Sequence, residues 1–273
     1  MNAQTVTGDG GTKLHVQEAG KRSGKPILFL HGFSQCSLAW SKQLNSDLAD
    51  SFRLVALDLR GHGLSDKPRG AYGDSAIWAN DVHAVIEQLD LPNPILVGWS
   101  YGGVIISDYV ARYGEGAIAG TNWVAAINRL GEPLMAGGFL GAEFLALAPG
   151  FFSENAEESV SALRSLIRLC IPSGLSPGEE WLLLGFNAAV PPHVRVGLLS
   201  RNLNGDAVVA GMRKPMLLTW GDKDKVVLPA MRDHIAGLAR HAKVSTYPGA
   251  GHASFWDMPE RFNRELRELR EAA

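Results

Sequence analysis

The chain has 273 residues, of which 46% are hydrophobic and 20% charged, and its formal net charge is −2. This length suits one large α/β domain, or one domain with an insertion. The sequence has no basic block that would indicate a nucleic-acid partner, and its two cysteines cannot form a disulfide framework. It also has neither a signal-peptide pattern nor a run approaching ~18 apolar residues, so we expect a cytoplasmic protein without a membrane partner.

Apolar runs alternate with helical patterns along most of the chain. The runs that predict strands are 4–7, 13–18, 26–30, 53–57, 95–97, 117–127, 215–220 and 243–247. The patterns that predict helices in the same alternation are 38–48, 76–89, 104–113, 228–239 and 259–271. Strands that alternate with helices favour a mainly parallel sheet covered by helices on both faces.

The alternation breaks between residues 129 and 208. Pairs of Gly and Pro there separate short helical stretches such as 156–169 and 179–188, and large apolar residues are frequent. We interpret this span as a helical cap over the carboxyl edge of the sheet, with leftover apolar surface lining a cleft. The predicted domains are therefore a core of 1–128 and 209–273 and a cap of 129–208. The alternative is an independent helical hairpin packed elsewhere on the body.

The segment 98–102, GWSYG, lies between a predicted strand and a predicted helix. A strand that reverses into a helix within about one residue strains the residue at the apex, and flanking glycines let the two elements approach. Ser100 would then project its hydroxyl at a helix N-terminus, where free N–H groups favour developing negative charge. We predict that Ser100 is a nucleophile. The alternative is a glycine-rich turn that holds an ordinary serine.

A serine nucleophile needs a base, and the base needs a carboxylate to orient it. Of the eight histidines, His252 lies in a glycine-rich loop just past the last predicted strand, at the same edge of the sheet. The flanking glycines of His31 and His62 favour turn roles for both. Asp222 and Asp224 compete for the place of the carboxylate. Asp222 follows a glycine directly and suits a turn, whereas Asp224 can reach inward.

The order serine, aspartate, histidine and five short motifs resemble the α/β-hydrolase family from about residue 26 to the end. The motifs are HGF at 31–33, DLRGHGLS at 58–65, GWSYGG at 98–103, GDKD at 221–224 and GAGH at 249–252. The resemblance implies an α/β fold with a mostly parallel eight-stranded sheet flanked by helices and a helical cap insertion. It implies Ser100 as nucleophile, His252 as base and Asp224 as third triad member. The oxyanion hole would be the main-chain N–H groups of Phe33 and Tyr101, worth roughly 10² to 10³ each in rate.

The side chain at position 100 separates branches of this family. Haloalkane dehalogenases and epoxide hydrolases of this fold attack with an aspartate, so Ser100 argues against both. The remaining branch includes carboxylesterases, acyl-homoserine lactonases, cofactor-free perhydrolases (the so-called non-haem haloperoxidases) and carbon–carbon bond hydrolases. Perhydrolases usually carry Met after the serine. Tyr101 therefore weakens that reading without removing it.

We predict a serine carboxylesterase that acts on small to medium hydrophobic esters through an acyl-enzyme, with no metal and no cofactor. The alternatives are hydrolysis of an acyl-homoserine lactone or another lactone, a perhydrolase-type side activity, and a slow-turnover ligand-binding protein on this scaffold. We expect an ester or lactone substrate, no nucleic-acid partner, and a monomer or homodimer. The aromatic candidates for the substrate pocket are Trp99, Phe139, Phe144, Trp181, Phe186 and Trp256.

Overall fold

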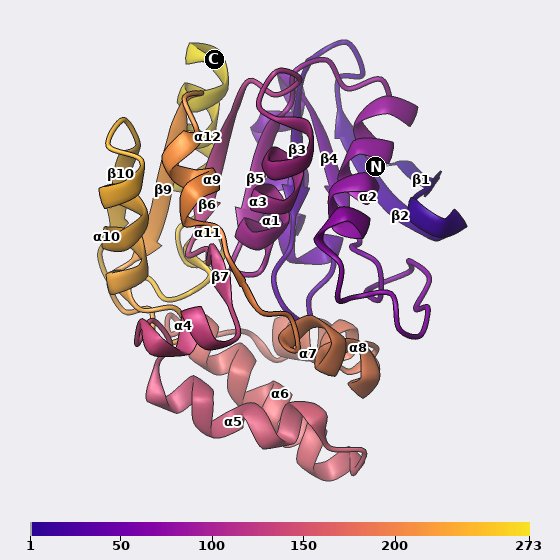
Figure 1. The fold of residues 1–273 in the computed structure, drawn as a ribbon, viewed down its shortest axis with the longest axis vertical. Coiled ribbons are helices and arrows are strands. Elements are labelled where there is room, and N and C mark those ends of the chain that lie inside the picture. Colours follow the sequence, from indigo (N-terminus) through magenta and orange to yellow (C-terminus); the bar gives the residue numbers. More distant parts are fainter. Residues whose placement is uncertain (1) are drawn as a thin grey trace.

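A twisted eight-stranded sheet forms the centre of the computed structural model, which describes residues 2–273 (Figure 1). Met1, the first residue of the predicted core domain, lies outside the described residues. The strand order is β1-β2-β4-β3-β5-β6-β9-β10. The strands are β1 (Asn2–Thr7), β2 (Lys13–Gly20), β3 (Lys25–Leu30), β4 (Phe52–Leu57), β5 (Ile95–Trp99), β6 (Gly120–Val124), β9 (Met216–Gly221) and β10 (Lys243–Tyr247).

The sheet is parallel except at one edge. β1 pairs antiparallel with β2, and β2 pairs antiparallel with β4, whereas the pairs from β4 to β10 are all parallel. Every residue of β4 and β5 is buried, which explains their continuous apolar sequences, since parallel strands are covered on both faces. The mostly parallel eight-stranded sheet is therefore confirmed.

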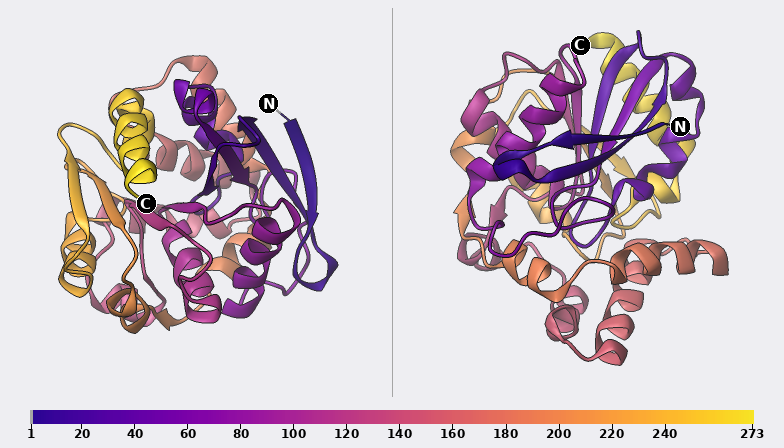
Figure 2. Two further views of the ribbon diagram at one scale, coloured as in Figure 1. Left: turned by 90° about the horizontal axis from the view of Figure 1, so that it is seen from above. Right: turned by 90° about the vertical axis from the view of Figure 1, so that its right-hand side faces the viewer.

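Helices of the body lie on both faces of the sheet (Figure 2). Contacts group α2, α3, α9 and α10 in one layer and α1, α11 and α12 in the other. Their bounds are α1 (Ser41–Leu44), α2 (Ser75–Gln88), α3 (Gly102–Tyr113), α9 (Asp206–Gly211), α10 (Pro229–Leu238), α11 (Ser254–Asp257) and α12 (Pro259–Ala272). The longer helices α2 and α12 bury apolar side chains such as Val82, Val85, Phe262 and Leu266, and burying one large apolar side chain contributes roughly 1.5–3 kcal/mol.

The predicted helix at 38–48 is wrong in its extent. The structure has the short helix α1 flanked by two 3₁₀ turns. Asn45 Nδ2 donates to the carbonyl of Ser41 (2.9 Å), while Ser46 Oγ donates to the carbonyl of Gln43 (2.7 Å) and accepts from the N–H of Leu48 (3.3 Å). These side chains satisfy backbone groups locally and so end the helix.

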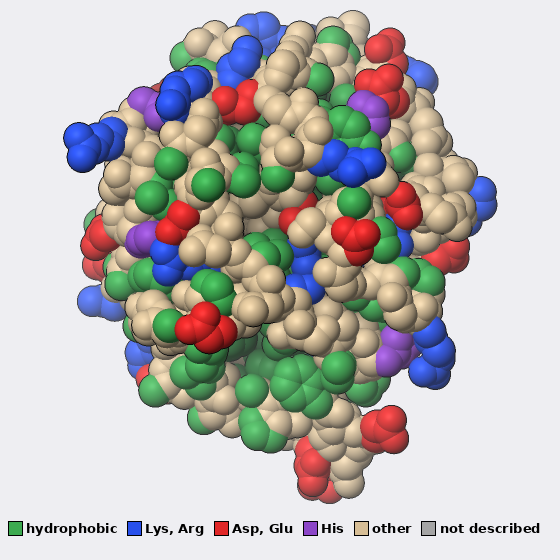
Figure 3. All heavy atoms as spheres, viewed as in Figure 1, with side chains coloured by type: hydrophobic (Ala, Val, Ile, Leu, Met, Phe, Trp, Pro, Cys, Tyr) green, Lys and Arg blue, Asp and Glu red, His purple; other side chains and the backbone are tan. Residues whose placement is uncertain are grey.

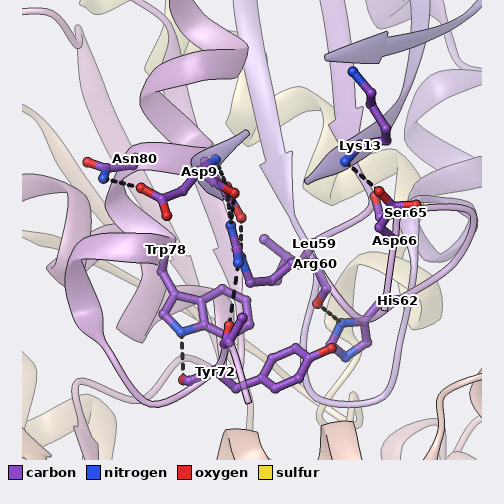
Figure 4. A network of polar contacts seen from close by, with 12 residues as sticks. Asp9, Lys13, Leu59, Arg60, His62, Ser65, Asp66, Tyr72, Trp78 and Asn80 are labelled. Atoms are coloured by element: carbon purple, nitrogen blue, oxygen red, sulfur yellow. Dashed lines mark hydrogen bonds and ion pairs between the residues drawn. The ribbon is translucent and has the colours of Figure 1, made fainter. Parts of the chain in front are cut away.

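The loop that follows β4 is fixed by buried polar contacts (Figure 4). Arg60 donates from Nε and Nη2 to the carboxylate of Asp81, both at 2.6 Å, and each side chain is 1% exposed. Asp58 accepts the N–H groups of Ser37 (2.6 Å) and Leu64 (2.9 Å). The DLRGHGLS motif thus forms a rigid loop beside the carboxyl end of β3.

Most of the chain between β6 and β9 forms a separate helical layer at the carboxyl end of the sheet (Figure 1). We call the helices α4 to α8 the cap. Its elements are β7 (Arg129–Leu130), α4 (Glu132–Ala136), α5 (Ala142–Phe152), α6 (Ala156–Cys170), α7 (Pro177–Ala188), α8 (Pro192–Leu199) and β8 (Leu203–Asn204). β7 and β8 pair antiparallel where the cap leaves and rejoins the body. The boundaries at 129 and 208 stay a prediction.

The outer face of the cap carries apolar side chains. Figure 3 shows hydrophobic side chains gathered over the part of the molecule where α5 lies. Leu145 and Phe152 of α5 are exposed. Within residues 2–273, no single helix is long and apolar enough to cross a bilayer, and only the bent pair α7–α8, counted together, has the required length and composition.

Candidate active site

Ser100 lies at the apex of a tight turn from β5 into α3. Its φ angle is 55°, in the left-handed region that a non-glycine residue rarely occupies. A Cβ on Gly98 would lie 2.7 Å from the carbonyl oxygen of Gly102, and one on Gly102 would lie 2.5 Å from that of Leu30. Only glycine fits at both positions. The strand-to-helix turn predicted around Ser100 is therefore present, with its backbone held in a strained conformation.

The side chains of His252 and Asp224 form a hydrogen bond between the loops that follow β10 and β9. His252 Nδ1 lies 2.9 Å from Asp224 Oδ2, and both residues are buried. Asp224 Oδ1 accepts the backbone N–H groups of Val226 (2.8 Å) and Val227 (3.0 Å). Both oxygens of this carboxylate are engaged, so His252 carries its proton on Nδ1 and leaves Nε2 as an acceptor.

Asp222, the competing carboxylate, has a different partner. Its Oδ1 accepts the backbone N–H of Gly249 at 2.7 Å, so it ties its own loop to the glycine-rich loop before His252. This is a turn role. Of the two aspartates in GDKD, only Asp224 contacts the imidazole among the described residues 2–273.

Ser100 and His252 line the same cavity, and the empty space between its lining atoms, open solvent included, is about 540 Å³. Within residues 2–273, no hydrogen bond joins Ser100 Oγ to the His252 imidazole. Such bonds are often long in ligand-free sites and tighten when substrate is bound. The rest of the lining is mainly apolar and comes from both the cap and the body: Ile127, Leu130, Leu134, Leu140, Phe144, Leu166, Leu199, Val226 and Val227.

Phe33 and Tyr101 also line this cavity. In the described part of the chain, neither backbone N–H donates a hydrogen bond to another protein group. Tyr101 stands at the N-cap of α3, where helix N–H groups lack intrahelical partners. The phenol packs beneath the cap, because its hydroxyl donates to the carbonyl of Leu198 (3.2 Å) and accepts from Arg201 Nη1 (3.1 Å). Burial raises the pKa of Tyr101 to about 12, so the phenol stays neutral.

His31 and His62 hold loops beside the cavity and stay neutral. His31 Nδ1 donates to the carbonyl of Gly32 (2.8 Å), and its Nε2 accepts the N–H of Leu59 (3.0 Å). His62 Nδ1 donates to the carbonyl of Arg60 at 2.9 Å. Burial lowers the pKa of His31 to about 4, and burial together with the neighbouring His31 imidazole lowers that of His62 to about 3. No cluster of three or more His, Cys, Asp or Glu side chains in residues 2–273 is arranged to hold a metal ion.

Residues 27–265 match the model of a family described as the alpha/beta hydrolase family. The chain belongs to this family. An esterase from Rhodococcus sp. ECU1013, RhEst1, has a similar solved structure, with 35% identity, a TM-score of 0.94 and 99% of both chains covered. A putative aryl esterase from Burkholderia cenocepacia has 33% identity and a TM-score of 0.92, covering 99% of this chain and 98% of its own. A non-heme chloroperoxidase from Streptomyces lividans is 29% identical over 276 residues, covering 96% of this chain and 97% of that protein. The predicted α/β-hydrolase fold is thus confirmed.

The aromatic residues expected in the pocket of this α/β hydrolase lie in different places. Trp99 and Phe144 line the cavity, and Trp256 lines a smaller neighbouring cavity together with Trp99. Three others lie outside the lining of the main cavity: Phe139, which packs against His234, Phe186, which is buried in the cap, and Trp181, which is 67% exposed. The side of α7 that carries Trp181 faces solvent, because the residues of α7 buried in the fold are Leu183, Leu184, Phe186 and Asn187.

Sequence reasoning missed the aliphatic lining of the cavity. Leucine and valine are common throughout the chain, so nothing in the sequence separates Leu134 or Leu166 from ordinary core residues. Val226 and Val227 could have been found, because they lie two and three residues after Asp224 in the loop that reaches the site.

Proposed function

We infer that this α/β hydrolase is a serine carboxylesterase that acts on small to medium hydrophobic esters. The observation that carries the proposal is the pairing of Asp224 with His252 at the wall of the apolar cavity that Ser100 also lines. The similarity to the two esterase structures supports the same conclusion. Phe144 and its aliphatic neighbours would receive the apolar part of the substrate.

The proposed mechanism uses an acyl-enzyme. His252 Nε2 takes the proton from Ser100 Oγ as that oxygen attacks the ester carbonyl carbon. The carbonyl oxygen becomes an oxyanion, which the backbone N–H groups of Phe33 and Tyr101 stabilise. As the carbon–oxygen bond to the alcohol breaks, His252 gives its proton to the leaving oxygen. Water then attacks the acyl-enzyme, passes a proton to His252, and Ser100 leaves with that proton.

Asp224 and Asp222 provide a matched test of this mechanism, because Asp224 contacts the His252 imidazole whereas Asp222 holds a turn. We expect Asp224→Asn to lower kcat for p-nitrophenyl butyrate by about 10⁴-fold, because the imidazole loses the carboxylate that fixes its tautomer. Asp222→Asn should keep kcat within about threefold of wild type. Ser100→Ala should lower kcat by at least about 10³-fold. If Ser100→Ala keeps full activity, the proposed mechanism is wrong.

A substrate panel separates the other activities. A lactone is a cyclic ester, so the same residues would open an acyl-homoserine lactone, and the chloroperoxidase relative favours a perhydrolase side activity as a second candidate. Rates with p-nitrophenyl esters, one acyl-homoserine lactone, and acetate with hydrogen peroxide would rank them. A stoichiometric burst of p-nitrophenol without turnover would instead indicate a ligand-binding protein. We further propose a cytoplasmic monomer or homodimer without nucleic-acid or membrane partners.

A further inference from the structure

The turn that follows β3 is fastened to the cap rather than to the body alone. The backbone N–H of Gln35 donates to the carbonyl of Gly32 at 3.3 Å, which closes a turn around Phe33 and Ser34. Ser34 is buried and has a φ angle of 61°, an unfavourable value for a non-glycine residue. The turn therefore needs contacts that hold it in this conformation.

Arg195 of α8 provides one such contact. Its Nε donates to Ser34 Oγ at 3.1 Å, and its Nη2 donates to the carbonyl of Asn187 at 2.9 Å. Its Nη1 donates to the carbonyl of Phe151 and to Ser159 Oγ, both at 3.2 Å. All four acceptors are neutral, and the side chain is 1% exposed.

Other cap side chains hold the residues on either side of Ser34. The ring of Phe33 packs against that of Phe151 at the end of α5, with ring centres 5.5 Å apart. The amide groups of Gln35 and Asn187 exchange hydrogen bonds at 3.3 and 3.4 Å, and Ser34 Oγ donates to the carbonyl of Asn187 at 3.3 Å. Three consecutive residues of the turn thus each contact the cap.

A buried cation without an anion is costly, and the four hydrogen bonds of Arg195 offset part of that cost while they join the cap to the turn. Burial lowers the pKa of Arg195 to about 10, so the guanidinium keeps its charge and all of its donors at neutral pH. The turn that it holds includes the N–H of Phe33, one of the two proposed oxyanion donors. Such donors act only when they lie about 2.7–3.1 Å from the developing oxyanion, so small displacements of the turn matter.

We propose that Arg195 is a positioning residue for the oxyanion hole. By holding Ser34 through its Oγ, the guanidinium aligns the neighbouring N–H of Phe33, and the seating of the cap is thereby coupled to the rate of acylation. This inference rests on the proposed esterase function and adds a residue to the same site. Arg195 does not line the cavity and touches no reacting atom.

The test compares Arg195→Met, Ser34→Ala and the double variant with wild type, using p-nitrophenyl butyrate. The concentration of working sites is first measured by exhaustive titration with a p-nitrophenyl phosphonate. We expect each single variant to lower kcat per titrated site by at least about 10-fold with KM within threefold, because the oxyanion forms only in the transition state. The double variant should equal Arg195→Met, since both changes break the same contact. Arg195→Lys keeps a cation and should recover part of kcat.

Arg168 supplies the matched control, because it is a cap arginine that contacts Glu180 and not the turn. Arg168→Met should leave kcat per titrated site unchanged. A merely structural role for Arg195 would lower the melting temperature and the yield of titratable sites while kcat per site stayed within twofold of wild type, and that result overturns the proposal. Fully additive losses in the double variant also overturn it.

Variants of Ser34 and Ser100 complete the test. If Arg195→Met does not fold, Ser34→Ala and Ser34→Gly report on the same contact. Glycine tolerates the φ angle but lacks the hydroxyl, so both should lose kcat alike, and full activity in Ser34→Gly contradicts the proposal. An unchanged Arg195 variant beside an inactive Ser100→Ala would reject only the positioning role. An active Ser100→Ala would reject the esterase mechanism itself.

Discussion

Arg60 of the body and Arg195 of the cap are both buried, but their surroundings differ. In the body, Arg53 faces Glu18 at 2.9 Å and Arg60 faces Asp81 at 2.6 Å, so each of these two cations has an anion. Arg270 of α12 is also buried, and among the described residues it donates only to the carbonyl of Asn93. In the cap, Arg195 is equally buried, and its hydrogen bonds within residues 2–273 go only to hydroxyl and carbonyl oxygens. Arg53 and Arg60 are explained as parts of the fold. Arg195 differs from Arg270 in the place of its acceptors, because its four hydrogen bonds join the cap to the turn that carries Phe33.

The same two regions contribute differently to the cavity. The proposed reacting side chains, Ser100, Asp224 and His252, come from loops that follow body strands. Helices of the cap contribute apolar walls such as Leu134 and Phe144. Substitutions at the reacting residues of the body should therefore act on the reaction itself, and substitutions in the cap residues that line the cavity on which substrate is accepted.

The largest effect on stability should come from the body pair of Arg60 and Asp81. Removing one partner of a buried pair leaves an uncompensated charge, so we expect Asp81→Asn to lower the free energy of unfolding by about 3–5 kcal/mol. The counterpart in the cap is the ion pair of Glu143 with Lys225, in which both side chains are more than half exposed. Glu143→Gln should change the same quantity by less than about 1 kcal/mol. Urea unfolding followed by tryptophan fluorescence measures both, and similar values would contradict the comparison.

A smaller effect on the free energy of unfolding should appear when pH falls, because the body contains two buried histidines. His31 and His62 are neutral in the fold but take up protons when unfolded, because burial lowers the pKa of each from 6.5 to about 4 and about 3. Their stabilisation is complete above pH 6.5 and is lost as pH falls toward these values. For His31 the shift corresponds to roughly 3 kcal/mol, and protonation of Nε2 would also break its bond from the N–H of Leu59.

The measurement is the free energy of unfolding in urea at pH 7 and at pH 4.5. Carboxylates also titrate at the lower pH. The informative quantity is therefore the loss in unfolding free energy between the two pH values, compared between wild type and His62→Gln. The variant lacks one buried imidazole and should lose less stability between the two pH values. Equal losses in wild type and variant would show that His62 takes up no extra proton on unfolding.

The sequence predicted the body well because its signals are local. Apolar runs buried on both faces define the strands, and glycines that allow close backbone approach define the turn at Ser100. Since parallel strands end at one edge of the sheet, the loops with Asp224 and His252 had to lie near that turn. The cap gave weaker signals. Pro149 and Gly150 form one of the pairs that were expected to separate helices, yet Pro149 lies inside α5, which packs against α6 and α8.

Cap side chains were harder to place for a related reason. Whether Trp181 faces the cavity or solvent depends on how α7 rotates against its neighbours, and an apolar residue alone does not specify that. Arg195 was also invisible to sequence reasoning, because its partners are backbone carbonyls and hydroxyls that no motif marks. A charged residue in an apolar cap helix is the signal that could have drawn attention to it.

The smallest expected effect concerns the choice of substrate and is tested with two cap aromatics that the sequence did not distinguish. Phe144 lines the cavity, whereas Trp181 is 67% exposed. Phe144→Ala should raise kcat/KM for p-nitrophenyl octanoate relative to the butyrate by roughly 10-fold, since a few methylenes in an apolar pocket discriminate by 1–3 kcal/mol. Trp181→Ala should leave the ratio within twofold. Equal shifts in both variants would mean that the cap selects substrates through its seating on the body rather than through the residues that line the cavity.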